Sequence, residues 1–113
     1  MKILHNPRCS KSRQALALIE QAGVEPEVVL YLETPPAAEE LDEILCKLGL
    51  EPMELVRRGE EIYKELGLGQ RELSRQEMIE LMVANPELIE RPIVIAGERA
   101  VLGRPPENVN ELL

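Results

Sequence analysis

The chain has 113 residues, of which 44% are hydrophobic, and this is enough for one domain with its own core. Thirteen basic and 21 acidic residues give a net charge of −8, which argues against general binding of nucleic acid or of anionic membranes. Two cysteines, no apolar signal segment and no apolar run long enough to cross a bilayer argue against a disulfide-stapled secreted domain, so we expect a cytoplasmic protein. With one histidine and two cysteines, a zinc site is not expected, and we expect no bound metal. A monomer is the default expectation for a compact acidic domain.

The first 32 residues have the pattern of a strand, a helix and a second strand. Residues 2–4 are apolar enough for a short buried strand, and residues 11–22 repeat apolar side chains at helical spacing until Gly23 stops the pattern. The apolar, β-branched run at 27–32 predicts the second strand. Because a helix connects them, we expect the two strands to be parallel with a right-handed crossover.

The middle of the chain has a helical pattern throughout. Thr34 is the expected N-cap of a helix that starts at Pro35-Pro36 and ends at Gly49. Further short helical segments are predicted at residues 52–57, at 60–66, after the capping box of Ser74 and Glu77, and at Asn85-Pro86. Together these segments form a helical insertion over about residues 35–90.

The last part of the chain predicts a hairpin and a final helix. Residues 93–95 and 100–102 are apolar runs on either side of a turn at Gly97, and a short helix starts at Pro105-Pro106. The order is therefore β-α-β, helical insertion, β-β-α. This order predicts an α/β protein with a thioredoxin-like fold, in which residues 1–113 form a single domain around a mixed four-stranded sheet.

Cys9 is the residue on which the chemistry centres. It follows the turn His5-Asn6-Pro7 and comes directly before the first helix, where free backbone N–H groups and the helix dipole favour an anion. A thiol in this position ionises more easily than a free one. Position 12 is Ser12, so a Cys-x-x-Cys dithiol is excluded, and a phosphatase loop is excluded because position 15 is Ala15. The sequence predicts a single thiolate that needs an outside thiol to complete a redox cycle.

Three arginines are candidates for binding an oxyanion. Arg57 follows an apolar pair, Arg91 precedes the hairpin and Arg104 follows it. Arginine is the side chain best suited to bidentate binding of such anions. The spacing of Arg91 and Arg104 allows them to meet at one end of the sheet, although solvated positions or backbone caps are the alternative for both. Arg58 is the alternative to Arg57.

The remaining polar residues near Cys9 have two interpretations each. His5 either orients or deprotonates Cys9, or is a hydrogen-bonded turn residue. Asn6 either contacts the thiolate or only forms the turn. Ser12 either supports the first helical turn or donates to the thiolate or the oxyanion. Cys46 lies in a helix, off its apolar stripe, and is interpreted as a structural thiol.

Several runs of the sequence, in this order, resemble the thioredoxin-fold arsenate reductases that are coupled to glutathione and glutaredoxin. These runs are His5-Asn6-Pro7, Cys9 to Arg13, Leu30 to Pro36, Tyr63 to Leu68 and Arg91 to Val94. The resemblance implies that Cys9 attacks arsenate while Arg57, Arg91 and Arg104 bind the oxyanion. It implies further that glutathione is a cosubstrate, that glutaredoxin completes the reduction to arsenite in arsenic detoxification, that no cofactor is bound, and that the bond before Pro92 is cis.

Two other functions stay open from the sequence. The first is a monothiol oxidoreductase that acts on glutathionylated or otherwise oxidised thiols. The second is a redox regulator of the Spx type, which binds RNA polymerase. The serine at position 12 and the three candidate arginines argue against the regulator, because it would need a second cysteine there to form a sensing disulfide.

Overall fold

Two sets of residues pack separately in the computed structural model, which describes residues 1–113. Residues 1–34 and 91–113 form one unit, called the sheet unit here, and residues 35–90 form the other, the helical unit. The sheet unit has seven basic and seven acidic residues, whereas the helical unit has six basic and fourteen acidic residues. The net charge of −8 therefore belongs entirely to the helical unit.

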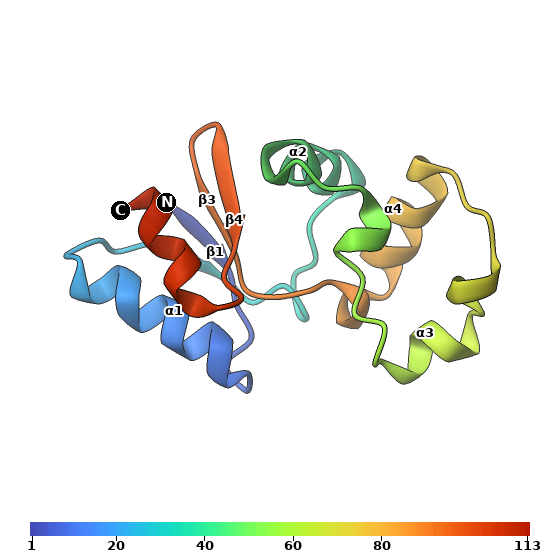
Figure 1. Ribbon diagram of the computed structural model, residues 1–113, viewed down its shortest axis with the longest axis horizontal. Coiled ribbons are helices and arrows are strands. Elements are labelled where there is room, and N and C mark those ends of the chain that lie inside the picture. The colour runs from blue at the N-terminus through green and yellow to red at the C-terminus, as the bar shows by residue number, and fades with distance from the viewer. The chain divides into compact units, whose positions relative to one another are not determined.

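The sheet unit contains a four-stranded mixed sheet in the order β2-β1-β3-β4. β1 (Lys2–Leu4) is parallel to β2 (Glu27–Val29). It is antiparallel to β3 (Ile93–Ala96), which forms a hairpin with β4 (Arg99–Leu102) (Figure 1). The predicted α/β class and mixed four-stranded sheet are confirmed. Because β1 lies in the centre of the sheet, the residues that follow it are held by neighbours on both sides.

Two helical segments pack together in the sheet unit. α1 (Ser10–Gln21) connects β1 to β2, and the final 3₁₀ segment η4 (Pro106–Leu112) lies against α1 (Figure 1). The fully buried core cluster that they share with the sheet consists of Ile3, Ala15, Ile19, Val94 and Val109. The apolar residues of α1 recur at helical spacing and so place one face of the helix on this core. The first turn of α1 lies next to the end of β1.

The helical unit consists of short segments around two longer helices. Its elements are α2 (Ala38–Leu48), η1 (Pro52–Glu54), α3 (Glu61–Glu65), η2 (Leu68–Gln70), α4 (Arg75–Ala84) and η3 (Pro86–Leu88). The predicted capping box of Ser74 and Glu77 is present at the start of α4, and Gly49 ends α2 in the left-handed conformation. None of the helices in the chain combines the length and the apolar character needed to cross a membrane.

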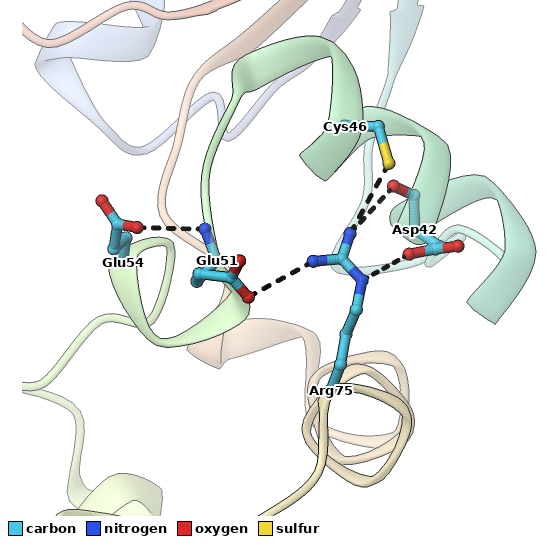
Figure 2. A network of polar contacts seen from close by, with 5 residues as sticks. All are labelled: Asp42, Cys46, Glu51, Glu54 and Arg75. Carbon is cyan, nitrogen blue, oxygen red and sulfur yellow. Dashed lines mark hydrogen bonds and ion pairs between the residues drawn. The ribbon is translucent and has the colours of Figure 1, made fainter.

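Arg75 connects the first turn of α4 to α2 and η1 (Figure 2). Its Nε lies 2.7 Å from Asp42 Oδ1, its Nη1 lies 3.5 Å from Glu51 Oε2, and its Nη2 lies 3.7 Å from Cys46 Sγ. Cys46 is exposed and is a free thiol. It therefore contributes to a polar network at the surface of the helical unit, not to a packed core.

Three predicted boundaries are wrong. The helix predicted at 52–57 is the 3₁₀ segment η1, which ends at Glu54. β2 ends at Val29 rather than at residue 32, because the Leu30 carbonyl accepts the N–H groups of Glu33 and Thr34 at 2.9 Å and so turns the chain. α2 is capped by Ala37 rather than by Thr34. Pro35 explains this shift, because it precedes Pro36 and a residue before proline is driven out of the helical conformation. Pro35 therefore does not form the first helical position after Thr34.

Candidate functional site

Cys9 lies between β1 and α1 and is the N-cap residue of α1. Its backbone N–H donates to the Asn6 carbonyl at 3.0 Å, and its own carbonyl accepts the N–H of Arg13 at 3.0 Å, which is the first hydrogen bond of the helix. The residue is 9% exposed. The sequence prediction of a thiol at a helix start is therefore confirmed by the structure, and this thiol is largely shielded from water.

The turn before Cys9 is held by side chains as well as by the backbone. Asn6 Oδ1 accepts the N–H of Arg8 at 3.0 Å, and Arg13 Nη1 donates to the Pro7 carbonyl at 2.9 Å. Of the two interpretations of Asn6, the structure thus displays the turn-forming one. Arg13 thus stabilises the turn through this hydrogen bond and also brings a positive charge near the thiol.

The surroundings of Cys9 favour its thiolate. Burial is the largest single influence and raises the pKa of the Cys9 thiol. The backbone N–H groups of Ser12 and Lys11 and the positive charges of Arg91 and Arg104 act in the opposite direction and prevail, so that the pKa lies below its ordinary value. A buried thiolate that is stabilised by N–H groups and arginines is suited to attack an electrophile that carries negative charge.

Arg104 makes the direct contact with the thiol. Its Nη1 lies 3.9 Å from Cys9 Sγ and donates to the Arg91 carbonyl at 3.3 Å. The Arg91–Pro92 peptide bond is cis, as the resemblance implies, and the Arg104–Pro105 bond is cis as well. The side chain of Arg104 therefore contacts the thiol, while Arg91 contributes its charge at the thiol and a backbone carbonyl that accepts from Arg104.

Gly103 is a residue of this site that the sequence analysis missed. Its N–H donates to the Pro92 carbonyl at 2.8 Å. A Cβ atom at this position would lie 2.8 Å from Pro92 Cγ and 3.4 Å from Ala15 Cβ. Only glycine allows such a close approach. The signal in the sequence is the glycine that separates a predicted strand from a candidate arginine, where a close backbone approach is a known reason for glycine.

His5 and Ser12 form a buried pair next to the turn. His5 Nδ1 lies 2.6 Å from Ser12 Oγ, which also accepts the N–H of Asn6 at 3.0 Å. His5 is 6% exposed and Ser12 is fully buried. Burial, and next the charge of Arg13, lower the pKa of His5, which favours its neutral imidazole. The structure thus links His5 to the turn through Ser12.

Arg57 belongs to the helical unit and is held there by carboxylates. Its Nη1 lies 3.3 Å from Glu60 Oε1, and its Nε lies 3.9 Å from Glu90 Oε1. Its backbone N–H donates to the Leu88 carbonyl at 2.7 Å. Arg58, the alternative candidate, is exposed. The assignment of Arg57 to an oxyanion site stays a prediction.

The sheet unit places one thiol beside guanidinium groups. No three or more His, Cys, Asp or Glu side chains in the chain are placed to hold a metal ion. Cys9 and Cys46 are both free thiols. A single thiolate with guanidinium groups beside it can form one covalent bond to an electrophilic centre of an anion, with the arginines neutralising the oxygens around that centre.

Comparison with known proteins gives consistent matches over the full chain. The model of the ArsC family matches residues 4–112. The uncharacterized protein YfgD of Escherichia coli is 54% identical over 100% of this chain and 96% of its own length, and an arsenate reductase of Neisseria meningitidis is 47% identical over 100% and 97%. The solved structure of an arsenate reductase from Vibrio cholerae has a TM-score of 0.95 at 50% identity, over 99% of this chain and 96% of that one.

Proposed function

This chain belongs to the ArsC family of thioredoxin-like proteins, and we propose that it reduces arsenate to arsenite in the cytoplasm with Cys9 as its nucleophile. The observation that supports this most strongly is the contact between Arg104 Nη1 and Cys9 Sγ at the start of α1. It combines in one place a thiol with a lowered pKa and a side chain suited to an oxyanion. The relatives named arsenate reductase support the choice of anion.

In the first step the Cys9 thiolate attacks the arsenic atom of arsenate. A sulfur–arsenic bond forms, one arsenic–oxygen bond breaks, and the oxygen leaves as water after it takes up protons. Arg104 and Arg91 stabilise the charge on the remaining oxygens, and Arg57 is included as the third arginine on the family pattern alone. Arsenic is still pentavalent at this stage.

Two outside thiols complete the reduction. Glutathione, as cosubstrate, displaces a second oxygen from arsenic, which leaves as water. The thiolate of glutaredoxin then attacks the glutathione sulfur. The bond between the glutathione sulfur and arsenic breaks with its electron pair on arsenic, which becomes trivalent. Glutathione and glutaredoxin are thereby oxidised to a mixed disulfide. Water releases arsenite from Cys9 and restores the thiol. The single thiol at the N-cap of α1 supports this division of labour, because it has no neighbouring cysteine to resolve the adduct.

The test is arsenate-dependent oxidation of NADPH in the presence of glutathione, glutaredoxin and glutathione reductase. We expect turnover by the wild type, none by Cys9→Ser, and wild-type turnover by Cys46→Ser, which removes the other thiol of the chain. Turnover by Cys9→Ser would overturn the proposal. Wild-type reduction of protein mixed disulfides without any arsenate turnover would instead establish the monothiol oxidoreductase as the function.

A further inference from the structure

Large apolar side chains are exposed on β2 of the sheet unit and in the turn that follows it. Val28, Leu30 and Leu32 are 44%, 36% and 43% exposed, and the only other exposed large apolar side chain is that of Leu113, at 44%. The first three lie on β2 and in the turn that follows it, and we call them the β2 patch. β2 is an edge strand, with β1 on one side and no strand on the other. Exposed apolar groups that gather in this way indicate a contact surface.

The β2 patch extends toward the end of the sheet at which Cys9 lies. β1 and β2 are parallel, with Leu4 opposite Val29, and the His5 N–H donates to the Val29 carbonyl at 2.8 Å. His5 and Leu30, the residues that follow β1 and β2, therefore lie at the same end of the sheet. Neighbouring strands are about 4.8 Å apart. The exposed residues Leu30 and Leu32 thus follow β2 at the same end of the sheet at which the turn to Cys9 follows β1.

Acidic side chains flank the patch, and one of them, Glu27, is paired with Lys2 of β1 at 3.7 Å. Glu25, Glu27 and Glu33 are exposed, and the sequence has no lysine or arginine between Arg13 and Lys47. Two copies of the chain joined through this edge would bring these carboxylates together, on molecules that each have a net charge of −8. Like charges at an interface oppose association, so the patch fits a partner with an apolar centre and a basic rim.

We propose that the β2 patch is the docking surface for the protein thiol that reduces the Cys9 adduct; this inference rests on the proposed function, which requires such a thiol. The partner is a small thiol-disulfide oxidoreductase whose own cysteine is surrounded by apolar side chains with lysine or arginine at the rim. Docking brings its thiolate to the sulfur bound at Cys9. Glutathione and other small thiols reach the same sulfur without using the patch.

The test uses the full chain with a preformed disulfide between Cys9 and glutathione, and no arsenate. The thiolate of glutaredoxin attacks the glutathione sulfur, the Cys9 thiolate leaves, and the oxidised product is the glutaredoxin–glutathione disulfide. The second-order rate constant is measured for wild type, Leu30→Asp and Leu32→Asp, with Leu113→Asp as the equally exposed control. Thioredoxin is run in parallel, and dithiothreitol serves as the small-thiol reference.

We expect Leu30→Asp and Leu32→Asp to lower the rate constant with the protein reductant about tenfold, the effect of losing a contact at the centre of an interface. Their rates with dithiothreitol, and all rates of Leu113→Asp, stay at the wild-type value. Glu33→Lys, which repels a basic rim, is expected to slow the protein reductant alone.

Wild-type rates in both patch variants, or an equal loss with dithiothreitol, would overturn the proposal. The proposal would also be overturned if neither glutaredoxin nor thioredoxin reduced the wild-type disulfide faster than dithiothreitol does. It would be overturned as well if the wild type were a dimer that dissociates in Leu30→Asp. Because arsenate is absent, a failure of the arsenate assay sinks the proposed function without affecting these rates.

Discussion

Arg104 and Cys9, which are 95 residues apart in the sequence, are joined through a 3.9 Å contact between Nη1 and Sγ. The same nitrogen donates to the Arg91 carbonyl at 3.3 Å, directly before the cis bond to Pro92. One guanidinium thus links the end of the hairpin, the loop before it and the thiol at the start of α1. The reactivity of Cys9 therefore depends on packing across the whole sheet unit as well as on its own turn.

Replacing Arg104 tests this link. Because its charge lowers the pKa of the Cys9 thiol, Arg104→Ala is expected to raise that pKa. It is also expected to lower kcat for arsenate by about 10²- to 10³-fold, the usual cost of removing one charge-stabilising donor. The pKa is measured from thiolate absorbance against pH in a Cys46→Ser background. Arg99→Ala, at an exposed position of β4, is the control, and an unchanged pKa in Arg104→Ala would contradict the assignment.

The lowered pKa of Cys9 also predicts how stability depends on pH. A group whose pKa is lower in the folded state stabilises the fold fully above its unfolded-state pKa, and this contribution disappears as the pH falls through the folded-state pKa. The free energy of unfolding of the wild type relative to Cys9→Ser should therefore increase with pH between these two values. Urea unfolding of both proteins from about pH 5 to about pH 9 measures it. A difference that decreases with pH would reverse the sign of the argument.

Gly103 is predicted to be intolerant of any side chain. In Gly103→Ala the new Cβ meets Pro92 Cγ at 2.8 Å, and we expect a loss of about 1–3 kcal/mol in the free energy of unfolding, as for other overpacked sites. Activity toward arsenate should fall too, because Pro92 follows the carbonyl that Arg104 binds. Gly59→Ala, which has nothing within 4 Å of its new Cβ, is the matched control. Equal stability of the two variants would show that the loop at Pro92 moves without cost to accommodate the new Cβ, and would contradict the prediction.

Arg57 and Arg58 are distinguished by arsenate kinetics. We expect Arg57→Ala to raise KM for arsenate or to lower kcat by about tenfold or more, whereas Arg58→Ala, at an exposed position, has little effect. Reduction of a mixed disulfide at Cys9 contains no oxyanion and should be unchanged in both variants. If Arg58→Ala alone impairs arsenate turnover, Arg58 takes the place of Arg57 in the proposal.

The sequence predicted best those features that depend on neighbouring residues. The helix after Cys9, the hairpin around Gly97 and the capping box at Ser74 are local patterns, and all three are present. The end of β2 was missed because Leu30 and Leu32 continue an apolar run, while a backbone turn that leaves no trace in hydrophobicity ends the strand.

Features that depend on distant contacts were beyond the sequence. Nothing local shows that Gly103 packs on Pro92, or that Glu90 lies beside Arg57. The contact between Arg104 and Cys9 was anticipated only as an approach of the two hairpin arginines to one end of the sheet. Its partner atoms come from the fold, because β1, α1 and the hairpin must assemble before those atoms meet.

The most direct test of the central claim is intact-protein mass spectrometry after incubation with arsenate and glutathione, without glutaredoxin, so that the adduct is not resolved. We expect a mass increase that corresponds to arsenic with glutathione on the wild type and on Cys46→Ser, and none on Cys9→Ser. An adduct that persists in Cys9→Ser, or that disappears in Cys46→Ser, would contradict the assignment of Cys9 as the nucleophile that attacks arsenate.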